Sequence, residues 1–168
     1  CGGFEIYCKN DQLKDIWKNI MNAGKKNNIK PIGLAARDTL RLEMGFCLYG
    51  NELSDNITPI EAGLGWITKF SKEFNGCKLL KSQKENGTDR KLVGFELIDK
   101  GIPRKDYEIY DSDNSNIGVV TSGTMSPSLG RAIGLGYVNA NLSKSGSIIY
   151  INIRNNMVKA VISKTPFK

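Results

Sequence analysis

Residues 117–137 read IGVVTSGTMSPSLGRAIGLGY, with an apolar, β-branched run on either side of Pro127. We predict strands over residues 117–122 and 133–137, because β-branched and aromatic side chains suit the pleated surface of a sheet. Glycine, serine and threonine fill the segment 121–127 and predict a turn, with hydroxyl groups but no evident base to activate them. The stretch therefore predicts two strands joined by a turn.

Runs of the same kind recur on both sides of this stretch, at residues 92–98, 107–110, 148–153 and 158–162. Clusters of Gly, Pro, Asn, Asp and Ser separate these runs. Short strands at this spacing are typical of a small antiparallel barrel or sandwich. We therefore predict an all-β domain over residues 88–168.

The first 87 residues have a different pattern and predict a mixed α/β region. Four apolar side chains share one face of a predicted helix that ends at Gly24: Leu13, Ile16, Trp17 and Ile20. Good helix formers fill residues 33–45, and a further helix is predicted over about 76–85. The change in composition near residue 88 predicts a domain boundary there, between domains of residues 1–87 and 88–168.

Three shorter segments of this region also lead to predictions. Residues 2–7 alternate apolar and polar side chains and predict a strand. Residues 58–61, Thr-Pro-Ile-Glu, predict the start of a short helix. Trp66 is expected to lie in the core, because large aromatic side chains are mostly used for packing.

The chain of 168 residues contains no histidine, which restricts the chemistry it can perform. Ser-His-Asp and Cys-His catalysis are excluded, as is a histidine general base. The net charge of +7 comes from 24 Lys and Arg against 17 Asp and Glu. The positive charge is spread along the sequence, which favours an anionic ligand or an acidic partner over a nucleic acid.

The four cysteines, at positions 1, 8, 47 and 77, form no C-x-x-C pair. Without histidine, a metal site would need all four scattered thiolates, so we predict no metal site and free buried thiols in a reducing compartment. No apolar run approaches the length of a membrane span, and we predict no membrane partner.

Two side chains are candidate binding residues. The glycines before Glu5 would let a ligand approach its carboxylate, which can accept two parallel hydrogen bonds from an amino-pyrimidinone ring. Arg37 lies in an apolar Gly-Leu-Ala-Ala context, where its charge needs a carboxylate or phosphate partner. The alternatives are an exposed strand glutamate for Glu5 and, for Arg37, an internal ion pair with one of three acidic residues: Asp38, Glu43 or Glu61.

These residues lie within motifs that resemble the aminomethyltransferase of the glycine cleavage system, the T-protein family. In the first domain the motifs are GFEI (3–6), GLAARDTLRLE (33–43), LYGNE (48–52) and TPIEAGLGW (58–66). In the second they are GIPR (101–104), IGVVTSGTMSP (117–127) and the terminal Pro-Phe. The motifs run in order over the whole chain and resemble the C-terminal half of the family.

The resemblance implies an α+β fold: the C-terminal part of the folate-binding aminomethyltransferase domain, followed by a small antiparallel β-barrel. It implies a transferase that moves the one-carbon unit from the lipoyl arm of the H-protein to tetrahydrofolate and releases ammonia. By motif, Glu5 resembles the family's pterin-binding glutamate and Arg37 its folate-contacting arginine. The implied location is the cytoplasm of a bacterium, or the mitochondrial matrix of a eukaryote.

The resemblance places the family's catalytic aspartate in the N-terminal half, so we expect this chain to be a fragment that is inactive alone. Two relatives of the same superfamily remain as alternatives: a folate-binding protein that is not a transferase, and a demethylating enzyme. A third alternative is a basic β-barrel that binds RNA or protein, although the sequence lacks clustered basic and aromatic residues.

Overall fold

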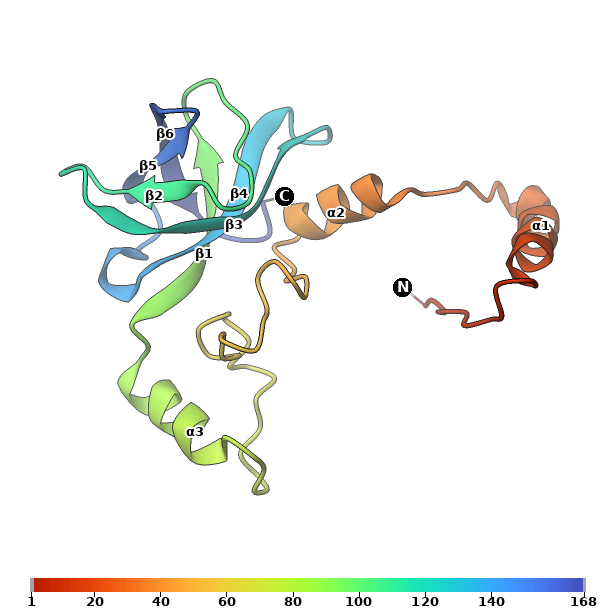
Figure 1. The fold of residues 1–168 in the computed structure, drawn as a ribbon, viewed down its shortest axis with the longest axis horizontal. Coiled ribbons are helices and arrows are strands. Elements are labelled where there is room, and N and C mark those ends of the chain that lie inside the picture. Colours follow the sequence, from red (N-terminus) through yellow and green to blue (C-terminus); the bar gives the residue numbers. More distant parts are fainter. Residues whose placement is uncertain (1, 168) are drawn as a thin grey trace. The chain divides into compact units, whose positions relative to one another are not determined.

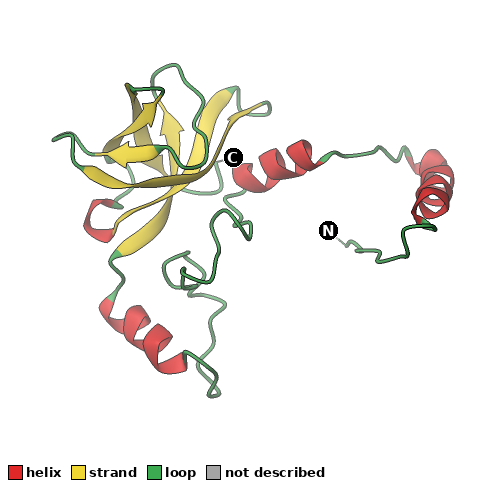
Figure 2. Ribbon diagram, viewed as in Figure 1, coloured by secondary structure: helices red, strands yellow, loops and turns green. Residues whose placement is uncertain are grey.

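The computed structural model describes residues 2–167, and its internal contacts divide the chain into two compact units, Cys1–Ala36 and Arg37–Lys168. Figures 1 and 2 show helices in the first half of the chain and strands in the second. The α-helices of the described residues are α1 (Leu13–Gly24), α2 (Leu34–Glu43) and α3 (Cys77–Asn86), with short 3-10 helices at Lys25–Asn27 and Ala140–Leu142. The strands are β1 (Arg90–Leu97), β2 (Glu108–Tyr110), β3 (Asn116–Ser126), β4 (Arg131–Asn139), β5 (Ile148–Ile153) and β6 (Asn156–Ser163).

All six strands belong to one closed antiparallel barrel in the order β1-β4-β3-β2-β5-β6 (Figure 1). Each of the six predicted β-rich runs overlaps one of these strands, so the predicted α+β fold with a small barrel is confirmed. Because β6 pairs with β1, each described strand of the barrel has a neighbour on both sides. The barrel is therefore complete within the second unit.

Apolar side chains from every strand fill the barrel: Val93, Phe95, Ile109, Ile117, Val120, Val138, Ile149, Ile151, Ala160 and Ile162. Ile133 and Leu135 lie on the opposite face of β4 and are buried in a second cluster with Leu42 and Phe167. The Phe95 ring lies against Gly134 on the neighbouring strand, and a Cβ at that position would collide with it. Gly134 is therefore required by packing, since only a residue without a side chain leaves room for the Phe95 ring.

Strand β3 is longer than predicted, because it includes most of the segment 121–127 that was predicted to be a turn. That segment is not a turn, because β3 continues to Ser126 and the turn occupies residues 127–130. The ladder has a register shift between Val120 and Ser122, and the hydroxyl residues Thr121 and Ser122 are buried beyond it. Their polar side chains are typical of a turn, but here both hydroxyl groups are buried in a strand. Their hydrogen-bonding capacity is satisfied by Glu52, which lies outside the barrel strands.

Three further predictions for the first 87 residues are wrong in detail. Residues 2–7 form no strand in the described chain, because an extended segment needs a neighbouring strand to complete its ladder. The segment from Thr58 forms overlapping hydrogen-bonded turns rather than a helix. Trp66 is 72% exposed rather than part of the core. The predicted helices, in contrast, correspond to α1, α2 and α3.

Candidate functional site

Glu5 lies in the irregular segment before α1, and its side chain is exposed. The Tyr7 hydroxyl donates a hydrogen bond of 3.0 Å to Glu5 Oε2. Within residues 2–167 no donor contacts Oε1, so one carboxylate oxygen and the remaining lone pair of the other can accept hydrogen bonds from a ligand. This exposure is compatible with both predictions for Glu5, an exposed glutamate without a ligand and a carboxylate that is accessible to a ligand.

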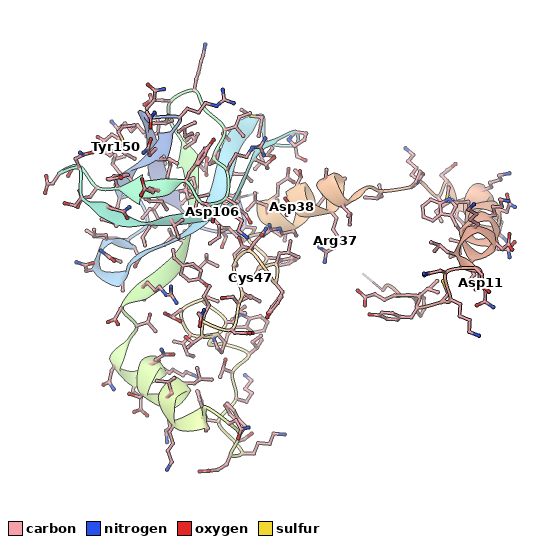
Figure 3. All side chains as sticks on the ribbon, viewed as in Figure 1. Asp11, Arg37, Asp38, Cys47, Asp106 and Tyr150 are labelled. Carbon is pink, nitrogen blue, oxygen red and sulfur yellow. The ribbon has the colours of Figure 1, made fainter. Side chains whose placement is uncertain are left out.

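Arg37 lies in α2 and is exposed, as Figure 3 shows. The internal ion pairs considered for it do not occur among the described residues, since each candidate carboxylate has another partner. Asp38 pairs with Arg41, Glu61 with Arg90, and Glu43 accepts a hydrogen bond from a serine of β3. The Arg37 guanidinium is therefore available to an anion, while Glu5 belongs to the other unit.

The guanidinium of Arg41, one helical turn beyond Arg37, is buried at 8% exposure. Nε donates to Asp38 Oδ1 at 2.8 Å, and Nη2 lies 2.6 Å from the same oxygen. Nη1 donates to Glu52 Oε2 at 2.6 Å and to the Phe46 carbonyl at 3.1 Å. Nη2 also donates to Ser122 Oγ at 2.6 Å. These partners use all the N–H directions that a guanidinium has.

Glu52 is completely buried at the centre of the same network. Its Oε1 accepts hydrogen bonds from Ser122 Oγ at 2.6 Å and from Thr121 Oγ1 at 2.7 Å. Its Oε2 also accepts one from the Leu48 backbone N–H at 2.9 Å. The Tyr137 hydroxyl donates to the Glu52 carbonyl at 2.9 Å. The Glu52 carboxylate thus connects α2, the segment after it and strand β3, while the Glu52 backbone carbonyl adds a contact to β4.

Sequence reasoning missed this network. It gave no buried partner to Arg41, and it assigned the hydroxyls of β3 to a turn. One available signal was Arg41 itself, a charged residue between Leu40 and Leu42. The partners Glu52 and Ser122 are 11 and 81 residues away in sequence, so no local pattern could identify them.

A second, more exposed group of charges surrounds Glu61. Its Oε2 accepts a hydrogen bond of 2.7 Å from the Thr58 N–H, and its Oε1 accepts one of 2.8 Å from Arg90 Nε. Burial alone would raise the pKa of Glu61, but the hydrogen bonds from Thr58 and Arg90 together lower it below the ordinary value. The Arg90 guanidinium also lies 5.4 Å from the centre of the Tyr137 ring. This group attaches the Thr58 turn to the first strand of the barrel.

An open cavity of about 450 Å³ lies between this segment and the barrel, lined mainly by apolar side chains that include Phe46, Leu64, Trp66 and Leu92. Cys47 also lines the cavity, and Figure 3 shows it on the segment after α2. Burial raises the pKa of the Cys47 thiol, and nearby Glu52 raises it further. The thiol is therefore held in its neutral form rather than activated as a nucleophile. Cys8 and Cys77 are also free and partly buried.

Two family models match the chain in consecutive segments. The GCVT N-terminal domain matches residues 2–72, and the glycine cleavage T-protein C-terminal barrel domain matches residues 90–168. The second match coincides with the closed barrel. The chain belongs to the glycine cleavage T-protein family.

Relatives and a solved structure agree with this T-protein assignment. The aminomethyltransferase of Flavobacterium psychrophilum is 60% identical over 166 residues, which are 99% of this chain and 46% of that protein. The aminomethyltransferase of Bacteroides thetaiotaomicron is 56% identical over 169 residues, or 99% of this chain and 47% of that protein. The crystal structure of the glycine cleavage system aminomethyltransferase T from Bartonella henselae has a TM-score of 0.83 at 30% identity and covers 92% of this chain and 43% of its own. This T-protein chain therefore spans about half the length of the curated relatives it matches.

Both predicted site residues lie within the matched T-protein segments. No helix in the described part of the chain is long and apolar enough to cross a bilayer. The carboxylate of Glu5 and the guanidinium of Arg37 are each accessible, and neither is occupied by an ion pair within residues 2–167. The Glu5 carboxylate by itself suits a pair of N–H donors, and the Arg37 guanidinium by itself suits an anionic group. Their assignment to folate remains a prediction.

Proposed function

We propose that this chain contributes to a tetrahydrofolate-dependent aminomethyltransferase of the glycine cleavage system. The observation that carries the proposal is the family membership of the whole described chain, combined with two accessible groups that can hold a folate. The reaction would move the methylene carbon of an aminomethyl group from the lipoyl sulfur of the H-protein to N5 and N10 of tetrahydrofolate. The protons of those nitrogens would leave with ammonia and the free lipoyl thiol, so the atoms balance.

Glu5 and Arg37 have different roles in this proposal. The Glu5 carboxylate accepts two hydrogen bonds from the amino-pyrimidinone part of the pterin ring, a geometry that fixes the ring in its plane. The Arg37 guanidinium pairs with an anionic group of the folate, for which its planar donors are suited. Both groups position the folate nitrogens for transfer. Neither role requires a histidine, consistent with a chain that has none.

The net charge of +7 supports an anionic cosubstrate and an acidic carrier protein. The resemblance assigns the catalytic aspartate to the half of the family's chain that these 168 residues do not match. We therefore propose that the chain alone produces no methylenetetrahydrofolate, although its binding residues function once the other half is supplied.

A chimera tests this proposal directly. The matching C-terminal part of the Flavobacterium psychrophilum aminomethyltransferase is replaced with this chain, to which it is 60% identical. The chimera should form methylenetetrahydrofolate from aminomethyl-lipoyl H-protein and tetrahydrofolate, while the isolated chain should not. Substitutions Glu5→Gln and Arg37→Ala should each weaken tetrahydrofolate binding about 10-fold to 100-fold, the usual effect of losing a hydrogen bond to a charged group.

Two matched substitutions serve as controls. Glu85→Gln removes an exposed carboxylate in α3, and Arg154→Ala removes an exposed guanidinium between β5 and β6. Both should leave the affinity for tetrahydrofolate unchanged. An active chimera whose affinity is unaffected by Glu5→Gln and Arg37→Ala would refute the site assignment, and a folded chimera without transfer activity would refute the function.

A further inference from the structure

We propose that Ser122 and Glu52 are positioning residues for Arg37, acting through Arg41 and helix α2. This inference rests on the proposed function, since Arg37 is taken to hold the anionic part of a folate. It assigns to the barrel a role beyond its own folding: strand β3 determines the direction in which the folate-contacting helix presents its guanidinium.

The first support is the uneven burial along α2. Its first residues, up to Arg37, are exposed, whereas the last three, Arg41, Leu42 and Glu43, are buried. Leu42 packs in a cluster with Ile133 of β4. A helix of ten residues is stiff, so the contacts at its buried end determine where its exposed end points.

The second support is the position of the two arginines. Residues four apart lie on one helical face, so Arg37 lies about 6 Å along the axis from Arg41 on the same side. The Arg41 guanidinium is held by four hydrogen-bonding partners, and Nη2 reaches Ser122 of the barrel at 2.6 Å. A small rotation of α2 would break several of these hydrogen bonds at once. The network therefore permits one orientation of the helix and of Arg37.

The third support comes from the energetics of buried charge. An ion pair that is removed from water gains little net stability, and apolar residues of similar size often replace it without loss. Arg41 and Glu52 are 8% and 0% exposed, so stability alone is a weak reason for their burial. A directional network with a fixed donor geometry provides a unique orientation, which an apolar contact at the same place would not.

Ser122 is the better residue to test, because removing its hydroxyl leaves the Arg41–Glu52 ion pair in place. The first measurement is hydrogen exchange of the 168-residue chain. The substitution Ser122→Ala should increase amide exchange in α2 by about threefold to tenfold, a typical effect of removing one contact from a coupled network. The barrel strands β5 and β6 should be unaffected. Ser122→Thr, which keeps the hydroxyl, should restore protection, and Ser163→Ala on β6 is the matched control.

The second measurement is a double-mutant cycle in the chimera described above. Ser122→Ala should raise the tetrahydrofolate dissociation constant by about threefold to tenfold when Arg37 is present. It should cause no further increase in the Arg37→Ala background, because a residue that acts through Arg37 has no effect without it. A purely structural role would weaken binding equally in both backgrounds.

The two measurements separate failure of this inference from failure of the proposed function. Unchanged exchange in α2 of the Ser122→Ala chain overturns the positioning role, whatever the chimera binds. Equal effects of Ser122→Ala in the two backgrounds also overturn it. Increased exchange in α2 together with an Arg37→Ala chimera of normal affinity supports the positioning of α2 and instead refutes the folate-binding role of Arg37.

Discussion

Helix α1 and strand β4 have the structures that their sequences predict, but they differ in what they bury. Seven of the nine residues in β4 are buried, whereas no residue of α1 is buried in the described chain. The apolar face of α1 is nonetheless regular, and two of its members, Leu13 and Trp17, are 56% and 53% exposed. Periodicity thus predicts the type of an element, while burial depends on the partner that the element finds.

The barrel supplies its own partners, because each strand pairs on both sides and directs apolar side chains into a shared interior. The first unit, Cys1–Ala36, contains α1 and a short 3-10 helix among its described residues before α2 begins. One helix cannot enclose its own apolar face, since a core requires at least two packed layers. The difference between the two regions should therefore appear in how much each contributes to stability.

The largest effect is expected for the substitution Phe95→Ala in β1. Phe95 is completely buried and its ring packs against Gly134, so its removal leaves a cavity that the closed barrel cannot fill. The free energy of unfolding should fall by about 3–5 kcal/mol, measured by urea denaturation with an unchanged m-value. Phe4→Ala is the matched control, since Phe4 is 98% exposed in the first unit, and it should leave the midpoint unchanged. Equal losses for the two variants would contradict the comparison.

The strands could be predicted because the signal for each lies in a few adjacent residues. Alternating or continuous β-branched runs between turn residues identified all six strands, and residues 148–153 have the same bounds as β5. The far end of β3 was missed because its hydroxyl groups resemble those of a turn. Only the buried carboxylates of Glu52 and Glu43, which lie outside the barrel strands, explain why Thr121, Ser122 and Ser126 can be buried.

The candidate site was predictable in a different way. Glu5 and Arg37 were identified by unusual local context and by motif, and the structure shows that both side chains are accessible. The network that holds Arg41 was not predictable, since it depends on contacts between residues more than 60 positions apart. Local patterns reveal which groups are present, whereas the fold determines which of them are brought together.

An intermediate effect is expected for Glu61→Gln, because the ion pair of Glu61 is less buried than Phe95 and less exposed than Trp17. Glu61 is 12% exposed and its partner Arg90 is 43% exposed, so at pH 7 the substitution should cost about 0.5–1 kcal/mol of unfolding free energy. Because the pKa of Glu61 is lowered in the folded chain, this stabilisation is present above the unfolded value of about 4.5 and is lost as pH falls through the folded value.

Urea denaturation at a series of pH values from 7 to 3 measures this dependence. The wild-type chain and the Glu61→Gln variant should differ at pH 7 and converge as the carboxylate is protonated. Glu85→Gln, an exposed substitution in α3, controls for general changes in charge. A difference that grew toward acidic pH would mean that Glu61 is destabilised by its surroundings, contrary to its hydrogen bonds with Thr58 and Arg90.

The smallest effect is expected for Trp17→Ala in α1, where the sequence pattern is strong but burial is weak. Because the Trp17 side chain is 53% exposed, its removal should change the free energy of unfolding by less than about 0.5 kcal/mol. Alanine has the higher helix propensity, so circular dichroism at 222 nm should show no loss of helix. A loss above about 1 kcal/mol, approaching that of Phe95→Ala, would show that α1 packs against a cooperative core in solution. The Trp17→Ala variant thus tests whether α1, which is more exposed than β4, also contributes less to the free energy of unfolding.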